Sequence, residues 1–219
     1  MTAAAPKRRK GRKFDQVIEG ARAVFMAHGF DGASVDEIAR AAGVSKATLY
    51  SYFPDKRVLF TEVAARECLR QADAALASID LTAPPAQVLD AVARRIIDFY
   101  SSDFGQAMFR LCVAETSRFP ELGQRFYESG PLMARARLGD YLRAAVARSE
   151  LVIDDIDLAA DQFVHLCNAD LHDRLLCGVE TRFAQAEVDR VVTGAVRMFI
   201  AAYGSANPAR GTVTAISTS

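Results

Sequence analysis

The sequence has 219 residues, of which 51% are hydrophobic and 25% charged, and its 27 Lys and Arg residues balance 27 Asp and Glu residues. This composition is typical of an ordinary soluble globular protein with one or two domains. No uninterrupted apolar run approaches the ~20 residues that a membrane span requires, which argues against a membrane protein.

Charge is distributed unevenly along the chain. Residues 1–60 carry 11 basic and six acidic side chains, and every lysine lies in the first 56 residues. The basic run near the start consists of Lys7, Arg8, Arg9, Lys10, Arg12 and Lys13. The imbalance predicts a basic module for a polyanion, joined to a neutral or acidic module with another task. The alternative is that the run is only a solvated tail.

The basic run does not begin a secretory signal. An amphipathic stretch with Asp15 and Glu19 follows it, and neither an apolar h-region nor a small-residue cleavage site is present. We therefore expect the protein in the cytoplasm, with no membrane partner.

A first helix is predicted from Phe14 to His28. Its apolar side chains recur at helical spacing and form one stripe: Val17, Ile18, Ala21, Val24 and Phe25. Gly29 ends the helix, because glycine readily adopts the conformation found after a helical C-terminus.

Two short helices follow, joined by a tight turn. "SVDE" at 34–37 is a capping box that begins the first of them, and Gly43 in the left-handed conformation ends it. Ser45 can cap the second helix directly. Two short helices joined by a glycine-containing turn of three or four residues are typical of a helix-turn-helix.

The second of these helices has a surface suited to DNA. With Leu49 inward, the outer face carries the small or hydroxyl-bearing residues Ala47, Thr48, Tyr50 and Ser51. Small residues allow close approach to bases, and hydroxyls bond base atoms and phosphates. Lys46 lies near the helix start, where such helices contact base edges. Asp55 can cap a fourth helix, whose N-terminus could bind a phosphate together with Lys56. The alternative is a small bundle with no function for its surface.

The stretch "GARAVFMAHGFDGASVDEIARAAGVSKATLYSYFPDKRVLF" resembles the N-terminal domain of TetR-family transcriptional regulators, with Gly20 taken as an alanine-like small residue. The matching part runs from about Phe14 to Phe60. The resemblance implies an all-helical homodimer whose N-terminal domain binds a palindromic operator, mostly as a repressor, and whose C-terminal domain binds an inducer. By position it assigns DNA-backbone contacts to Ser34, Tyr50, Tyr52 and Lys56, and base reading to Ser45, Lys46, Ala47 and Thr48. Ala47 departs from many relatives, which have glycine there.

The rest of the chain is expected to be helical, which makes the fold class all-α. Expected helices span residues 56–79, 85–101, 105–118, 120–149 with a bend at Gly130-Pro131, 157–178 and 184–203. "LCVAETSRFPELGQRFYESGPLMARARLGDYLR" and "RMFIAAYG" resemble the C-terminal domain of AefR-like members of the family. We expect a flexible arm at 1–13, a DNA-binding domain at 14–60, a ligand-binding and dimerisation domain at 61–204, and a flexible tail at 205–219.

The last two expected helices carry apolar faces that could form a dimer as a four-helix bundle. These faces comprise Leu158, Phe163, Leu166, Leu171, Leu175, Val188, Val191, Val192, Val196, Phe199 and Ile200. The alternative is that they pack within one subunit.

A pocket for a small hydrophobic or amphipathic inducer would lie between helices around residues 85–180. Its candidate lining is Met108, Phe109, Cys112, Phe126, Tyr127, Met133, Phe163 and Leu166, which could equally be simple core. Arg110 and Glu115 are candidates for orienting the ligand.

Other chemistry is set aside. His165, Cys167, His172 and Cys177 cannot all meet on one side of a single helix, so we expect no metal and no cofactor. Glycine-rich phosphate loops, GxSxG and HExxH are missing, so no enzyme is expected. A redox response at Cys68 or Cys112, a non-specific DNA-coating protein and a helical interaction module remain as alternatives.

Overall fold

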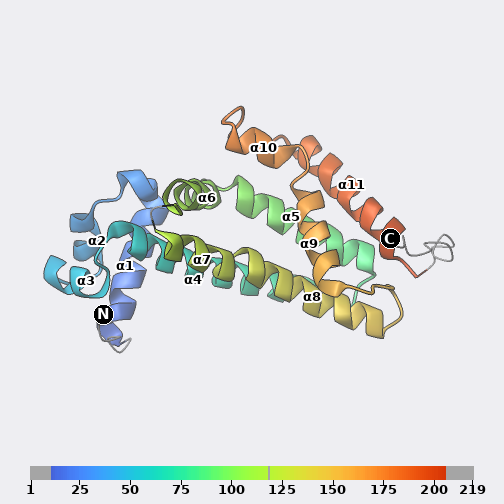
Figure 1. Ribbon diagram of the computed structural model, residues 1–219, viewed down its shortest axis with the longest axis horizontal. Helices are drawn as coiled ribbons and strands as arrows, with labels where there is room; N and C mark the ends of the chain where they lie inside the picture. Colours follow the sequence, from blue (N-terminus) through green and yellow to red (C-terminus); the bar gives the residue numbers. More distant parts are fainter. Residues whose placement is uncertain (1–10, 118, 206–219) are drawn as a thin grey trace, which may run out of the picture. The chain divides into compact units, whose positions relative to one another are not determined.

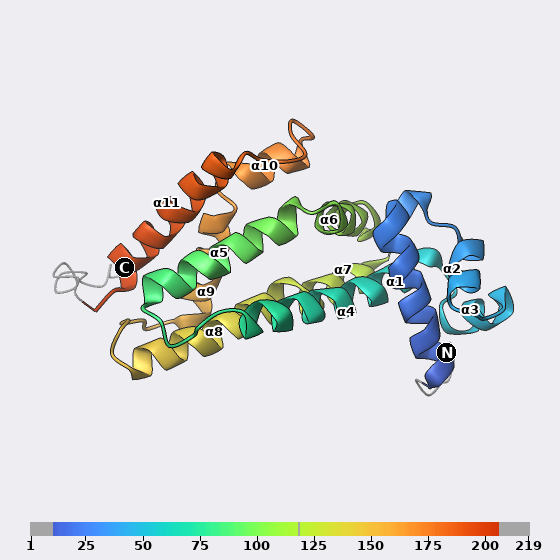
Figure 2. The ribbon, with the colours of Figure 1, turned by 180° about the vertical axis from the view of Figure 1, so that it is seen from behind.

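The computed structural model describes residues 11–117 and 119–205, and at positions 75, 76 and 122 it describes the backbone alone. Lys7, Arg8, Arg9 and Lys10 of the expected arm, and almost all of the expected tail, lie outside the described residues. Within them the chain forms helices and one isolated bridge between Leu151 and Gly204, so the all-α fold class is confirmed (Figures 1 and 2). The helices are α1 (Arg12–Gly32), α2 (Val35–Ala41), α3 (Lys46–Tyr52), α4 (Lys56–Ala77), α5 (Pro85–Ser101), α6 (Asp103–Glu115), α7 (Pro120–Ser129), α8 (Pro131–Ala147), α9 (Ile156–Cys167), α10 (Leu171–Leu176) and α11 (Gln185–Tyr203).

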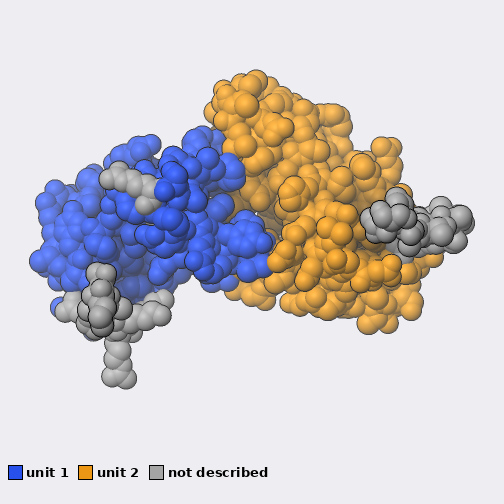
Figure 3. Space-filling view, in the orientation of Figure 1, with its two compact units in different colours: residues 1–72, 102–132 blue, residues 73–101, 133–219 orange. Residues whose placement is uncertain are grey.

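The chain divides into two compact units (Figure 3). The first takes the chain up to Ala72 together with residues 102–132, and the second takes residues 73–101 together with the chain from Met133 on. The two units are defined by how the chain packs. The domain boundaries expected at residues 13, 60 and 204 separate parts with different functions, and they stay a prediction.

The first unit contains the helix-turn-helix. Helix α1 packs against α2 and α6, α2 against α3, and α6 against α7. Aromatic rings fill its centre: Phe60 lies edge-on to Phe25 at 4.9 Å between centroids, and it also contacts Phe30 and Phe104. Each short helix is thus anchored on α1 or on its neighbour, which compensates for the instability of a seven-residue helix alone.

The second unit is built on an apolar core shared by α5, α8, α9 and α11. Helix α11 packs along α5 and α9, and α5 also contacts α9. Phe163 and Phe199 meet in the core with ring centroids 5.2 Å apart, and both are almost completely buried.

Two expected helices are in fact broken. The helix expected at 157–178 ends at Cys167 and restarts at Leu171, because Asp170 adopts a left-handed φ of 67°. Asp170, with a ψ of −40°, is the centre of a γ-turn in which the Leu171 amide donates to the Ala169 carbonyl at 2.8 Å, so the break occurs without glycine or proline. The expected bend at Gly130-Pro131 separates two helices, α7 and α8.

Several of the apolar residues expected to form the dimer interface lie in the interior of the second unit. Phe163, Leu171, Val191, Val192 and Phe199 belong to the core of the second unit. Four other residues of these faces, Leu166, Val188, Val196 and Ile200, are only partly buried against that core, so dimerisation through the last two helices stays a prediction. Leu158, by contrast, is 52% exposed.

Candidate nucleic-acid interface

The start of α2 carries the predicted capping box. The Glu37 amide donates to Ser34 Oγ at 3.2 Å, and the Ser34 amide donates to Glu37 Oε2 at 3.1 Å. The bond from the Ser34 backbone holds the pKa of the Glu37 carboxyl below its usual range, and the bond from the Ser34 hydroxyl acts in the same direction. Ser34 is therefore fixed at the exposed end of α2, where a backbone contact with DNA was assigned.

The turn into α3 also follows the sequence. Gly43 has a left-handed φ of 62°, and Ser45 Oγ accepts from the Thr48 amide at 3.1 Å. The Ser45 and Thr48 hydroxyls also bond each other at 2.9 Å, and Ser51 Oγ donates to the Thr48 carbonyl. Local bonds thus hold the hydroxyl groups of Ser45, Thr48 and Ser51 in place.

Helix α3 presents most of the predicted face outward, although Thr48 is half-buried. Leu49 is 1% exposed and faces the interior, whereas Tyr50 is 48% exposed and Ala47 and Ser51 are exposed. Tyr52 is half-buried, with its ring 5.7 Å from the Phe14 ring in an edge-on arrangement. A short helix with one side chain anchored inward and small or hydroxyl-bearing residues outward can approach a DNA groove closely.

The position of α2 against α1 depends on Gly20. A Cβ atom there would lie 2.5 Å from the Ala42 backbone nitrogen and 2.7 Å from the Ala42 Cα. The obstacle is backbone and cannot rotate away. Gly20 is therefore not equivalent to alanine, which corrects the sequence interpretation.

Lys46 has a partner that the sequence interpretation missed. Its ammonium forms an ion pair with the Asp36 carboxylate in the first turn of α2, and both side chains remain more than half exposed. The pair links the first turns of the two helices of the helix-turn-helix. The ten-residue separation carried no local signal, because no helical spacing joins the two positions.

Lys56 is engaged within the chain. Its ammonium donates to the carbonyls of Phe30 at 2.7 Å and Ala33 at 2.9 Å, and it lies 4.3 Å from the centre of the Phe30 ring. It therefore fastens the start of α4 to the end of α1. A contact of Lys56 with phosphate stays a prediction, and it would compete with these two acceptors.

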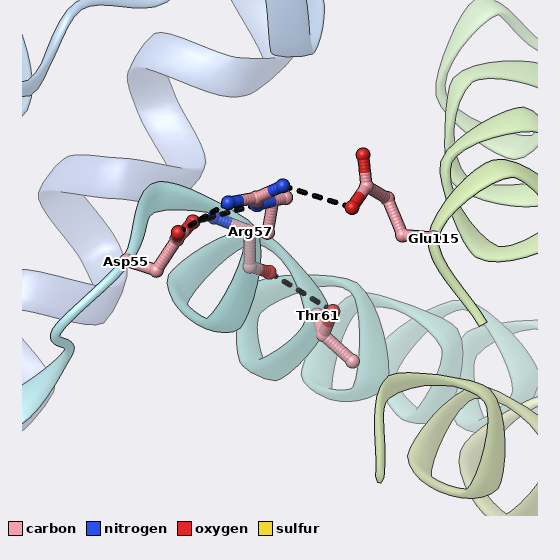
Figure 4. A network of polar contacts seen from close by, with 4 residues as sticks. All are labelled: Asp55, Arg57, Thr61 and Glu115. Carbon is pink, nitrogen blue, oxygen red and sulfur yellow. Dashed lines mark hydrogen bonds and ion pairs between the residues drawn. The ribbon is translucent and has the colours of Figure 1, made fainter. Parts of the chain in front are cut away.

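The corner between α3 and α4 is also tied to α6 (Figure 4). The Asp55 carboxylate accepts from the Arg57 backbone amide at 2.7 Å. It also accepts two bonds from the Arg57 guanidinium, from Nε at 3.0 Å and from Nη2 at 2.7 Å. The remaining Nη1 donates to Glu115 Oε2 at 2.8 Å, and the guanidinium lies 4.6 Å from the centre of the Phe119 ring. Glu115, a candidate for orienting a ligand, is thus bound by an arginine 58 positions away.

A second ionic cluster lies between α1 and α4. Glu67 is 4% exposed, and its carboxylate accepts from Arg22 Nε at 2.7 Å and from Gln71 at 3.0 Å, with Arg70 also 3.0 Å away. Burial disfavours the charged form, but the hydrogen bonds and the nearby cations outweigh it and hold the pKa of Glu67 below its usual range. This cluster stiffens the support of the helix-turn-helix.

The candidate pocket residues divide between the two units. Met108 and Cys112 are buried, Phe109 faces Phe126 at 6.3 Å between ring centroids, and Tyr127 is 50% exposed. These five belong to the first unit. The other three, Met133, Phe163 and Leu166, belong to the second, where Phe163 is core. The pocket stays a prediction.

The cysteines give little support to a redox response. Burial raises the pKa of Cys68 to about 12, of Cys112 to about 11 and of Cys167 to about 12. A thiol must ionise to react, so these three are protonated at neutral pH.

A metal site was set aside on the premise of one continuous helix, which is wrong because the helix breaks at 168–170. In the described part of the chain, no three His, Cys, Asp or Glu side chains are grouped as metal ligands. None of the described helices is long and apolar enough to cross a membrane.

Comparison with known protein families shows which family the chain belongs to. The model of the family described as "Bacterial regulatory proteins, tetR family" matches residues 17–63. The model described as "AefR-like transcriptional repressor, C-terminal domain" matches residues 87–205, more than half of the chain. The chain belongs to the TetR family. The resemblance inferred from the sequence is therefore confirmed, including its AefR-like part.

Two solved structures are similar to this chain over most of its length. A TetR-family transcriptional regulator from Mesorhizobium loti MAFF303099 is 30% identical with a TM-score of 0.73, and the comparison covers 90% of this chain and 100% of that one. The flavonoid-responsive regulator FrrA is 33% identical with a TM-score of 0.65, covering 89% of this chain and 98% of FrrA.

Among curated proteins, the HTH-type transcriptional repressor AcnR of Corynebacterium efficiens is 36% identical over 58 residues, which are 26% of this chain and 31% of AcnR. The chain thus spans about a third of the length of this curated relative.

Proposed function

We propose that this TetR-family protein is a sequence-specific DNA-binding transcriptional regulator, most simply a repressor that binds a palindromic operator as a homodimer. The observation that carries the proposal is the presentation of α3. Its start is capped by Ser45, Leu49 anchors it, and Ala47, Tyr50 and Ser51 are left outward. Such a helix fits the major groove, with Lys46 at the end where base contacts occur.

The relatives support the same function. AcnR is named an HTH-type transcriptional repressor, and residues 17–63 of this chain match the tetR family model. FrrA is named flavonoid-responsive. We propose that the C-terminal domain of this chain likewise responds to a small hydrophobic or amphipathic molecule, which would release the DNA. Because chromosomal DNA is the partner, the site of action would be the cytoplasm.

Dimerisation would use the outward sides of α9 and α11. Met198 is 57% exposed, and Ala201 and Ala202 are exposed on the same side of α11, three and four residues further along. Leu158 supplies an exposed apolar side chain on α9. Small residues allow two helices to approach closely, and a two-fold pair would place two α3 helices in consecutive major grooves, about 34–36 Å apart. Met198→Asp should yield monomers in sedimentation analysis, whereas Val113→Asp, at a 65% exposed position of α6, should not.

The test of DNA reading is selection of bound duplexes from a random pool. The selected duplex and a scrambled one are then titrated at two salt concentrations. An enriched inverted repeat, bound at least 1,000-fold more tightly than the scrambled duplex, is the expected result. Equal binding of both, with the same steep dependence on salt, would contradict the proposal.

Two lysine variants separate base reading from phosphate binding. Lys46→Ala should change which sequences are enriched. Lys13→Ala, at an exposed position in the first turn of α1, should weaken binding to every sequence and reduce the salt slope by about 0.9. Lys56→Ala is a poorer control, because it also removes the two bonds to the end of α1.

A further inference from the structure

Asp36 has no part in the cap of α2, although it lies inside the capping box. Glu37 supplies the carboxylate that closes the box, through its bond to the Ser34 amide. Asp36 instead pairs with Lys46 across the turn, and the side chains are 56% and 58% exposed. An acidic side chain on a DNA-binding surface repels phosphates, so its presence beside the predicted base-reading lysine calls for an explanation.

Lys46 lies at an electrostatically unfavourable position in α3. It is the first residue of α3, where the helix dipole disfavours a cation. Asp36, in the first turn of α2, stands where a helix favours an anion. The pair therefore offsets the unfavourable position of Lys46 and restricts its ammonium to the side of α3 that faces α2.

Lysine needs such restriction to read a base. Its ammonium is a point charge on a flexible four-carbon stem, and phosphates compete strongly for it. A guanine edge offers the acceptors O6 and N7 in the major groove. An ammonium that donates one proton to Asp36 keeps two donors for those acceptors, while the adjacent carboxylate makes a phosphate an unfavourable partner.

We propose that Asp36 is a positioning residue for sequence specificity, which holds the Lys46 ammonium for a guanine edge and away from the DNA backbone; this rests on the proposed operator-binding function. Asp36 thus contributes selectivity at the expense of general affinity. The contrasting view is that the pair simply breaks when DNA binds, so that Asp36 lowers affinity for all sequences alike.

The experiment compares Asp36→Ala with the wild-type protein on the selected operator and the scrambled duplex, each at two salt concentrations. Asp36→Ala should bind the scrambled duplex more tightly, with a salt slope steeper by up to about one, because Lys46 now neutralises a phosphate. The ratio of operator to scrambled affinity should fall roughly tenfold, the discrimination expected of one good base contact. Duplexes selected with Asp36→Ala should show no preferred base at the position where Lys46→Ala changes the selected sequence.

Four further variants make the result specific. Asp31→Ala removes one exposed negative charge from the same unit without touching Lys46, and it should leave the affinity ratio unchanged. Asp36→Asn preserves the size of the side chain and should lower the ratio of operator to scrambled affinity as Asp36→Ala does. Asp36→Glu keeps the carboxylate and should retain most of the wild-type ratio. In the Lys46→Ala background, Asp36→Ala should change the base preference no further.

Tighter binding of Asp36→Ala to both duplexes by the same factor, with an unchanged ratio and unchanged selected sequence, would overturn the inference alone. A wild-type protein that does not distinguish the two duplexes would overturn the proposed function and the inference with it.

Discussion

The helix-turn-helix and the second compact unit are held together by different means. Helices α2 and α3 have seven residues each, and serine side chains cap their starts. Helices α5, α9 and α11 are longer and pack through an apolar core whose members come from distant parts of the chain. The comparison teaches that the starts of the DNA-facing helices are fixed by bonds across three residues, whereas the second unit depends on packing between distant segments. Substitutions in the two regions should therefore differ in size and in kind.

The largest effect is expected in the core of the second unit. Phe163→Ala removes a fully buried ring that contacts Phe199, and it should lower the free energy of unfolding by about 3–5 kcal/mol. Urea unfolding followed by circular dichroism measures the loss. Leu176→Ala, in the same unit but 44% exposed, is the matched control and should cost under about 1 kcal/mol. Similar losses for both would show that the core is not where the structure places it.

An intermediate effect is expected where distant charges support the helix-turn-helix. Glu67→Gln weakens the bonds to Arg22 and Arg70, and it should cost about 1–3 kcal/mol at neutral pH. The folded-state pKa of Glu67 lies below its unfolded value, so its stabilisation is present above about pH 4.3 and is lost as the pH falls through the folded pKa. The gap between wild type and variant, measured from pH 7 to pH 3, should therefore narrow below about pH 4. A constant gap would mean that the charge of Glu67 contributes nothing.

The smallest effect is expected at a local cap. Ser34→Ala removes the acceptor for the Glu37 amide and should cost about 1 kcal/mol. Amide hydrogen exchange should show the loss concentrated in α2, with little change in α11. Ser34→Asp, which keeps a capping oxygen, serves as the control and should retain most of the protection. Uniformly faster exchange throughout the chain would contradict a local role.

The same contrast explains how much the sequence could predict. The capping box at Ser34, the left-handed Gly43 and the cap at Ser45 were predictable, because each depends on residues within a few positions of one another. The face of α3 followed from helical periodicity once Leu49 was set inward.

Contacts between distant segments were not predictable. The bonds of Lys56 to the end of α1 and of Arg57 to Glu115 join residues 23 to 58 positions apart, and no local pattern reveals which carboxylate or carbonyl an arginine or lysine will reach. The break at Asp170 was missed because it lacks glycine and proline. The apolar faces of the last helices were recognised, but periodicity alone does not tell whether such a face packs within the chain or on a second copy.

The close approach of Gly20 to Ala42 matters to anyone who wishes to engineer the protein. Residues 34–53 could be transplanted to another helical scaffold as a recognition segment. The segment would keep its caps and its turn, but it would lose the close contact with Gly20 that sets its distance from α1. The recipient helix would need a glycine opposite Ala42, since even a methyl group there meets backbone. The smallest DNA-recognition unit that can be transferred is therefore residues 34–53 together with α1.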